Sequence, residues 1–445
     1  MKDSRVSDAL EVLERGFAAQ RVARHLCKAI GPRPSASTAI EEAREFLRAE
    51  WSSFGAQGIH AETVPLVAWE PRGCVVKVGN AHSEAITALH CVGSAAGSVT
   101  APVLDAGNLT ALELNTLGPE AHGSIFLIAG SQISGGPFEA MQKRVSLAEA
   151  AGAAGILIAG RHRQLPSIEY IKHSHVPVAG ISEEAADRIA AMRKERIVQA
   201  AIEVDGRSRR TQCASLAAEI NAGQPADGNE VIILCAHLDS FSIAPGAIDN
   251  ITGVATVCEI ARALAPLSPQ FKRTLRIIAF TGEEYGYAGS KHYVRKHAEE
   301  LDRIRFVVSL DCLFEETAQG MAVMWSPAMR DYLAVATQAG GNAVDIRNHY
   351  CMSSDYLPFM LAGIPAARPA DWKNNFPPWT HTTEDTFDKI SFAALRANAR
   401  LLVPLLARML TDEQIPTQRM SPAHVAEAIR QEDAEDSLRW QIVLP

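Results

Sequence analysis

Imidazole and carboxylate side chains follow short apolar segments in the second half of the chain. The segments are 231–236, 274–280 and 305–310, and each is followed within a few residues by His, Asp or Glu. Further candidates stand in loops, one of them between two glycines. The candidate residues are His237, Asp239, Asp249, Glu283, Glu284, Asp311 and His381. Imidazole and carboxylate together are ligands that suit divalent metals, zinc among them, so we expect a metal centre.

Two glutamates stand side by side at Glu283 and Glu284. Neighbouring anions at the end of a buried strand repel each other and are costly to desolvate unless a cation compensates them. A bound metal would do so. Because successive side chains diverge past a strand end, one glutamate can bind metal while the other accepts a proton, as in zinc peptidases generally.

Apolar segments alternate with an amphipathic helical segment, 254–264, in this part of the chain. The alternation predicts an α/β fold with a parallel or mixed sheet covered by helices on both faces. In such sheets ligands bind beyond the carboxyl ends of the strands, where the candidate ligands stand. A helix is also expected near the start, because Thr38 and Glu41 form a capping-box pattern ahead of apolar residues at helical spacing.

Charge and hydropathy exclude two classes of partner. The 445-residue chain has 43 Lys and Arg against 51 Asp and Glu, a net charge of −8 without long runs of one sign. A nucleic-acid-binding protein needs a concentrated basic face, so no nucleic-acid partner is expected. The longest stretch nearly free of charge, 85–104, is too rich in Gly, Ser, Thr and Pro for a membrane span, so no membrane partner is expected.

The eight cysteines form no C-x-x-C pair and have no regular spacing. The pattern favours neither a zinc ribbon nor a disulfide framework, and scattered thiols are typical of a reducing compartment. Residues 1–30 carry charges throughout and lack the apolar core of a signal peptide. We therefore expect a cytoplasmic protein.

The middle of the chain predicts a separate small α+β unit. Residues 125–128 form an apolar run typical of a strand, and a helix is expected from about Phe138 to Ala150. Residues 150–160 then predict a helix end that turns into a second buried strand.

The tail after Thr411 predicts one further helix. Its small and apolar residues Ala423, Ala426 and Ile429 would lie on one side. We expect this helix to pack back on the core, and a contact in a homo-oligomer is the alternative.

Several short segments carry a family resemblance. They are GPRPSAS (31–37), AHLDS (236–240), PGAIDNITG (245–253), FTGEEYGYAGS (280–290), SLD (309–311), SSDYLPF (353–359), AGIP (362–365) and HTTEDTFD (381–388). Together they resemble the co-catalytic di-zinc aminopeptidases of metallopeptidase family 28, which also contains glutamate carboxypeptidases and glutaminyl cyclases. The resemblance covers about residues 10–95 and 211–410. It implies a three-layer zinc-exopeptidase fold with a mixed, mostly parallel central sheet flanked by helices.

The resemblance also implies two Zn²⁺ ions per chain, with Co²⁺ or Mn²⁺ as substitutes. Asp249 would bridge the two ions. Glu284 and His381 would complete one site, and His237 and Asp311 the other.

The catalytic roles implied by the resemblance belong to Glu283 and Asp239. Glu283 would be the general base, and Asp239 would orient His237 from outside the ligand set. Asp355 would have a comparable supporting role.

The middle unit resembles a protease-associated domain, which is a common insertion in this family. The implied organisation is a discontinuous zinc peptidase domain over 1–92 and 212–411, a protease-associated domain over 93–211, and a C-terminal helical extension over 412–445. Such inserted domains typically form part of a cleft wall or an interaction surface.

The function that these residues favour is a zinc-dependent exopeptidase, specifically an aminopeptidase that releases N-terminal residues from a peptide or small amide substrate. A carboxypeptidase, a dipeptidase or a small-molecule amide hydrolase is the alternative on the same metal centre, and Arg368 could then hold a substrate carboxylate. A non-catalytic binding protein on the same scaffold is a third interpretation, and a complete ligand set weighs against it.

Overall fold

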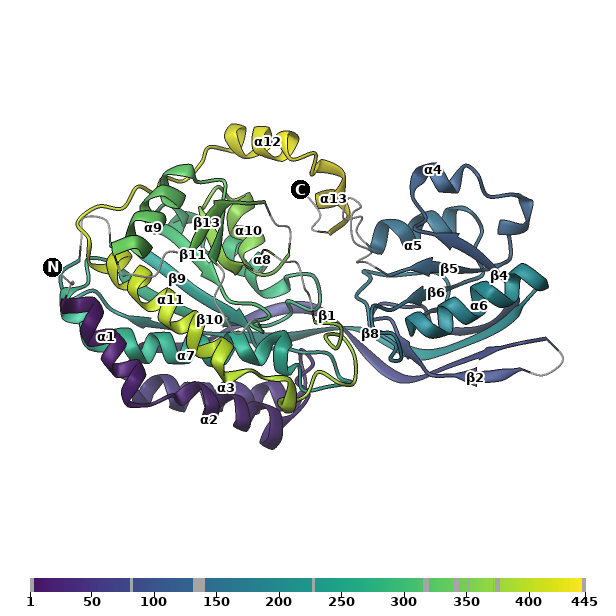
Figure 1. Cartoon of the computed structure of the whole chain (residues 1–445), viewed down its shortest axis with the longest axis horizontal. Helices are drawn as coiled ribbons and strands as arrows, with labels where there is room; N and C mark the ends of the chain where they lie inside the picture. Colours follow the sequence, from purple (N-terminus) through teal and green to yellow (C-terminus); the bar gives the residue numbers. More distant parts are fainter. Residues whose placement is uncertain are drawn as a thin grey trace. The chain divides into compact units, whose positions relative to one another are not determined.

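The computed structural model describes residues 4–80, 83–130, 141–225, 229–314, 320–339, 344–350, 353–370, 372 and 377–441 (Figure 1). The chain forms two compact units. The first unit consists of Met1–Leu66, Gln212–Pro377 and Asp385–Ala434. The second unit consists of Val67–Thr211, Pro378–Glu384 and Glu435–Pro445. The assignment of a peptidase domain and an inserted protease-associated domain stays a prediction, because compactness alone does not identify a domain family.

A mixed, mostly parallel sheet forms the centre of the first unit. Its strand order is β13-β12-β14-β11-β9-β10-β8. Strands β12 and β14, and strands β10 and β8, pair antiparallel, whereas the other neighbours pair parallel. The strands are β8 (Gln199–Ile220), β9 (Val231–His237), β10 (Thr274–Phe280), β11 (Ile304–Ser309), β12 (Gly320–Met324), β13 (Asp345–Asn348) and β14 (Ala366–Ala370).

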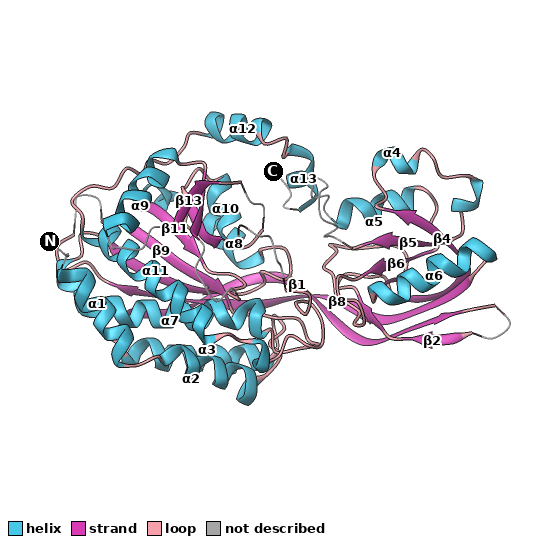
Figure 2. Cartoon of the chain, in the orientation of Figure 1, coloured by secondary structure: helices cyan, strands magenta, loops and turns pink. Residues whose placement is uncertain are grey.

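Helices cover both faces of this sheet (Figure 2). Helix α7 packs on β9 and β10 and contacts α1, α2, α3 and α11, while α10 packs on β11 and β14 and contacts α8. Helix α9 contacts α11, β12 and β13. The helices are α1 (Ser4–Arg15), α2 (Ala18–Arg24), α3 (Thr38–Ser53), α7 (Thr252–Leu264), α8 (Ala288–Lys296), α9 (Pro327–Ala339), α10 (Tyr356–Leu361), α11 (Phe392–Thr411) and α12 (Pro422–Gln431). The predicted α/β fold, with helices on both sides of a mixed, mostly parallel sheet, is confirmed.

The central strands are apolar because both of their faces are covered. Every residue of β9 is buried, and helix α7 is buried along nearly its whole length. Buried strands of this kind have continuous apolar sequences instead of alternating ones. The stretch Ala247–Gln270 is long and apolar enough to cross a membrane by composition, and 78% of its most apolar window is buried inside the structure, as in a helix of a protein core.

Most of the other strands lie in the second unit and pair onward from β8. Strands β4, β5, β6 and β7 pair parallel in that order, β7 pairs antiparallel with β3, and the first half of β8 pairs antiparallel with β4. The strands are β1 (Gln57–Val78), β2 (Glu84–Ile86), β3 (Ala88–His90), β4 (Gly97–Gly107), β5 (Ile125–Ala129), β6 (Gly155–Ala159) and β7 (Val178–Ile181). The helices are α4 (Ala111–Leu114), α5 (Met141–Ala150), α6 (Glu183–Glu195) and α13 (Glu435–Gln441). The predicted strands at 125–128 and near 155 are confirmed, and the expected start of α5 at Phe138 lies outside the described residues.

The single helix predicted for the tail is wrong. Two helices, α12 and α13, form there. Helix α12 buries Val425 and Ile429, which are four residues apart, and leaves Ala423 and Ala426 exposed. The larger side chains gain more from leaving water than the two alanines do, so they decide which face turns inward. The tail does pack back on the protein, as expected.

Candidate metal centre

Three parallel strands bring most of the candidate residues to one edge of the first unit's sheet. In the pairing of β9 with β10, His237 stands opposite Phe280, and Ser309 of β11 stands opposite Cys235. His237 is therefore the last residue of its strand. Glu283 and Glu284 follow the end of β10, and Asp311 follows the end of β11. This is the carboxyl edge at which the sequence predicts the site.

Asp249 reaches the same edge from the turn Ala247–Ile251, which comes just before α7. Gly246 begins this turn with φ +63°, and a Cβ atom there would lie 2.2 Å from the carbonyl oxygen of Asp249. Asp249 itself has φ −116° and ψ 83°, which is not helical. The turn thus departs from helical geometry at the residue that the sequence predicts as the bridging ligand.

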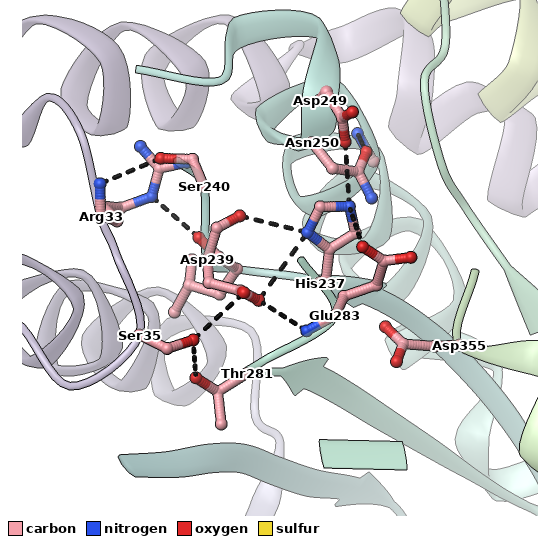
Figure 3. Close-up of polar contacts among 12 residues, drawn as sticks. Arg33, Ser35, His237, Asp239, Ser240, Asp249, Asn250, Thr281, Glu283 and Asp355 are labelled. Carbon is pink, nitrogen blue, oxygen red and sulfur yellow. Dashed lines mark hydrogen bonds and ion pairs between the residues drawn. The ribbon is translucent and has the colours of Figure 1, made fainter. Parts of the chain in front are cut away.

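The five residues brought together form overlapping sets of potential ligand atoms. One set is His237, Asp249 and Glu284, and another is His237, Glu283 and Asp311; the atoms of each set lie within 4.8 Å of one another. His237 Nε2 is 3.1 Å from Asp249 Oδ1 and 4.0 Å from Glu283 Oε2 (Figure 3). It is also 3.6 Å from Asp311 Oδ1.

Cys312 is a further candidate ligand, which is not among those predicted from the sequence. It forms a third set with Asp249 and Asp311, again with ligand atoms within 4.8 Å. The sequence marks Cys312 only by its position directly after Asp311, because the residue after a strand-end ligand can turn toward the same site.

The charges in this cluster favour a bound cation. Burial, reinforced by the negative charge of Asp311, raises the pKa of Glu283 well above its usual range. Burial and the charges of Asp249 and Glu283 do the same for the pKa of Glu284. The carboxylates thus disfavour one another's ionised forms, which is the situation that a divalent cation relieves.

Two buried atoms of the cluster also have no hydrogen-bond partner within the described part of the chain. They are His237 Nε2 and Asp311 Oδ1. A buried carboxylate oxygen without a hydrogen bond is costly, and a metal ion would satisfy it. The donor set of one imidazole and four carboxylates therefore fits a divalent metal of the zinc type.

His237 is held in the tautomer that metal binding requires. Its Nδ1 lies 3.1 Å from the backbone carbonyl oxygen of Asp239, which can only accept a hydrogen bond. Nδ1 therefore carries a proton, and in the neutral imidazole Nε2 has the lone pair that a metal would bind. Burial lowers the pKa of His237, but the surrounding carboxylates, Glu283 first among them, outweigh burial and raise it well above its usual range.

The contact of Asp239 with His237 differs in detail from the expected one. The carboxylate Oδ1 of Asp239 is 3.8 Å from His237 Nδ1, too far for a hydrogen bond. Oδ1 instead accepts the backbone N–H of Glu283 at 3.2 Å, and Oδ2 accepts the Ser35 hydroxyl at 3.1 Å (Figure 3). The carbonyl of Asp239 orients the imidazole, and its carboxylate positions the backbone of the expected base.

Asp355 lies outside the ligand sets found among the described residues. Its Oδ1 accepts a 2.6 Å hydrogen bond from the Ser290 hydroxyl, and Figure 3 shows its carboxylate facing the side of Glu283. Burial raises the pKa of Asp355 to about 7, although the nearby His237 opposes the shift. Its supporting role stays a prediction.

His381 is not in the ligand sets found among the described residues. It belongs to the short segment Pro378–Glu384 that groups with the second unit, where its carbonyl oxygen accepts the N–H of Ile168 at 2.8 Å. Its role as a ligand of the first metal therefore stays a prediction.

Two buried residues around the centre had no role assigned from the sequence. Arg33 is fully buried, and its Nε donates to the carbonyl of Leu238 at 2.9 Å. Asp385 is 2% exposed and accepts backbone N–H groups of the Asp249 turn. Both stand in segments that carry the family resemblance, but hydrogen bonds to backbone groups leave no signature in residue types.

The chain is similar to known peptidases. Residues 215–406 match the model described as peptidase family M28. The chain is 26% identical over 332 residues to aminopeptidase YwaD of Bacillus subtilis, a match covering 72% of this chain and 69% of the relative. It is 28% identical over 303 residues to carboxypeptidase Q of Mus musculus, covering 64% of this chain and 63% of the relative.

Solved structures show the same fold. A peptidase M28 precursor from Shewanella amazonensis superposes with a TM-score of 0.81 at 21% identity, covering 94% of this chain and 99% of that chain. The zinc aminopeptidase BSAP from Bacillus subtilis superposes with a TM-score of 0.70 at 22% identity, covering 91% and 98%. The matched segment 215–406 contains every residue of the ligand sets described above. In this segment, the chain is similar to peptidase family M28.

Proposed function

We propose that this protein is a zinc-dependent exopeptidase, and specifically an aminopeptidase that releases N-terminal residues from peptides. The supporting observation is that two sets of potential ligands overlap at Asp249: one contains His237 and Glu284, and the other contains Asp311 and Cys312. A carboxylate can bridge two metals, so we propose two Zn²⁺ ions per chain, with Co²⁺ or Mn²⁺ as substitutes. Aminopeptidase YwaD, whose name states the same activity, supports the choice of substrate end.

His237, Asp249, Glu284 and Asp311 would hold the metal, with His381 as the remaining proposed ligand. When bound, zinc lowers the pKa of a coordinated water to about 7 and polarises a peptide carbonyl.

Glu283 would accept a proton from that water and return it to the leaving amine. Its carboxylate Oε2 is 4.0 Å from the ligand atom Nε2 of His237, so it stands beside the ligands. Its backbone is fixed by the hydrogen bond to Asp239 Oδ1. A base held at a fixed position next to the reacting atoms needs little reorganisation during the reaction.

A carboxypeptidase is the second candidate, because carboxypeptidase Q is a relative at 28% identity. That activity needs a cation for the substrate carboxylate. Arg368 lies in β14, half-buried, and its Nε donates to the carbonyl of Pro369 at 3.2 Å. The similarity is a stronger argument for this candidate than Arg368, which this contact engages within the chain.

A pair of substrates distinguishes the two candidates. An aminoacyl anilide has a free amino group and no carboxylate, whereas an N-blocked dipeptide has a free carboxylate and no amino group. We expect the zinc-loaded protein to cleave the anilide. Cleavage of the blocked dipeptide alone would reject the aminopeptidase in favour of a carboxypeptidase, and cleavage of neither, with less than about one zinc bound per chain, would favour a non-catalytic binding protein.

We further propose that residues 93–211 form a protease-associated domain that provides an interaction surface. The parallel order β4-β5-β6-β7 with helices α5 and α6 supports a separate folding unit. We also propose a cytoplasmic location, which the seven free cysteines among the described residues support.

A further inference from the structure

We propose that Asp385 is a positioning residue of the metal centre, which holds the turn that carries Asp249. Its carboxylate uses both oxygens on this turn: Oδ1 accepts the N–H of Ile248 at 2.7 Å, and Oδ2 accepts the N–H of Asp249 at 3.1 Å. The backbone carbonyl of Asp385 accepts the N–H of Ala247 at 3.2 Å. Three successive backbone donors of the turn thus bind one residue that is more than a hundred positions away in sequence.

These donors need a partner from elsewhere. The N–H groups at the start of a helical segment have no carbonyl four residues earlier to bind. Gly246, at the N-cap position, has no side chain to accept them, and Asp249 and Asn250 interrupt the helical geometry before α7 begins. Asp385 serves as a remote cap, and because it is a buried carboxylate its hydrogen bonds are of the strong, charge-assisted kind.

The opposite side of the turn is already fixed. The Asn250 side chain donates from Nδ2 to the carbonyl of Leu310 at 2.8 Å, and its Oδ1 accepts the N–H of Cys312 at 3.3 Å. These two backbone groups flank Asp311. Asn250 therefore joins the turn to the end of β11, while Asp385 holds the other side, and together they set the distance between Asp249 and Asp311.

The consequence of losing Asp385 is a turn that is attached on one side only. Asp249 Oδ1 stands 3.1 Å from His237 Nε2, a separation suited to sharing a metal ion between them. A shift of the backbone by a few tenths of an ångström would spoil the coordination geometry, since residues that orient ligands typically contribute about 10–100-fold to metal affinity. This inference rests on the proposed metal-dependent function only in that Asp249 is taken as a ligand.

The test compares zinc binding by the metal-free full-length protein and its Asp385→Asn variant, measured by calorimetric titration with Zn²⁺. The asparagine keeps the size of the side chain but points an NH₂ group at one of the two N–H donors. We expect zinc affinity to fall by about 10–100-fold. At limiting zinc the turnover of an aminoacyl anilide should fall, and excess zinc should restore it with little change in KM.

Thr256→Val is the matched control. Thr256 is fully buried on α7 and donates to the carbonyl of Thr252 at 2.8 Å, so the variant also loses one buried hydrogen bond. We expect it to lower the melting temperature of the metal-free protein and to leave zinc affinity unchanged. Unchanged zinc affinity in Asp385→Asn, or an equal loss in Thr256→Val, would overturn the positioning role and leave a purely structural one.

Three further outcomes each have a defined interpretation. If Asp385→Asn does not fold, Asp385→Glu takes its place, because it keeps the charge and moves the acceptors by one methylene; wild-type zinc affinity in that variant overturns the proposal. If the wild-type protein binds zinc but cleaves no amide, the proposed function fails, whereas the zinc titration still decides the role of Asp385. A wild-type protein that binds no zinc overturns both.

Discussion

Glu283 and Glu284 are chemically identical neighbours with different surroundings. Glu284 belongs to the set with His237 and Asp249, whereas Glu283 belongs to the set with His237 and Asp311 and has its N–H bound by Asp239. The divergence of successive side chains past the end of β10 separates them. The sequence predicts this division because two adjacent carboxylates need different partners.

Replacing Glu283 by glutamine tests whether Glu283 and Glu284 have different roles. The amide keeps the shape of the side chain but cannot accept a proton, so we expect kcat on an aminoacyl anilide to fall by about 10²–10⁴-fold. Zinc content, measured by elemental analysis, should stay at the wild-type value. Asp388→Asn changes an exposed carboxylate elsewhere in the first unit and should leave both unchanged. Wild-type turnover by Glu283→Gln would remove Glu283 from the role of base.

The sequence predicted the types of residue at the site better than their individual contacts. All five residues of the two main ligand sets are among the candidates that the sequence predicts, because strand ends concentrate functional side chains. The contact of the Asp239 carboxylate with Glu283, and that of Asp385 with the Asp249 turn, involve backbone N–H groups. Every residue except proline has such a group, so no pattern of residue types marks these contacts.

At the level of elements, close packing fixes the Asp249 turn against the end of β11. A Cβ atom on Gly253 would lie 2.3 Å from Asn250 Oδ1 and 2.4 Å from the carbonyl oxygen of Leu310. Neither atom can move freely, because Leu310 accepts the side-chain amide of Asn250 and Asn250 Oδ1 accepts the N–H of Cys312.

Gly253→Ala should therefore destabilise the protein and weaken zinc binding together. We expect a loss of about 1–3 kcal/mol in the free energy of unfolding, the usual cost of overpacking, measured by urea denaturation of the metal-free protein. Gly16→Ala is the matched control, since a Cβ there meets nothing within 4 Å. A Gly253→Ala protein as stable as wild type, with full zinc affinity, would show that the turn accommodates the extra atom.

The boundaries of elements were less predictable than their existence. The central strands and α7 appear where the apolar runs predict them, but the cap of α3 is one residue earlier than expected. Ser37 is the N-cap and its hydroxyl accepts the N–H of Ile40, so the capping box predicted at Thr38 and Glu41 does not form. Serine and threonine cap helices about equally well, and the chain path after Pro34 decides between them.

At the scale of the whole molecule, the stability of the second unit should depend on pH through His90. Burial lowers the pKa of His90 to about 4, from about 6.5 in an unfolded chain. The unfolded state therefore binds more protons between these two values, and stability rises with pH across this window and falls as the pH drops through it. A shift of this size corresponds to about 3 kcal/mol at most, at 1.36 kcal/mol per unit.

His90→Phe isolates this contribution. The ring of His90 stacks on Trp69 with centroids 4.6 Å apart, and phenylalanine keeps an aromatic ring there without a titrating group. We expect the free energy of unfolding of the variant to fall less than that of wild type between about pH 6.5 and about pH 4. Urea denaturation at each pH measures it. Equal losses in the two proteins would assign the pH dependence to other groups.

The central claim is that the cluster around His237 is a metal centre that carries the activity. The most direct measurement removes metal with a chelator and follows hydrolysis of an aminoacyl anilide while Zn²⁺ is added back to the whole protein. We predict that the metal-free protein is inactive and that activity returns in proportion to bound zinc, reaching its maximum at two ions per chain. Full activity in the metal-free protein would contradict the claim.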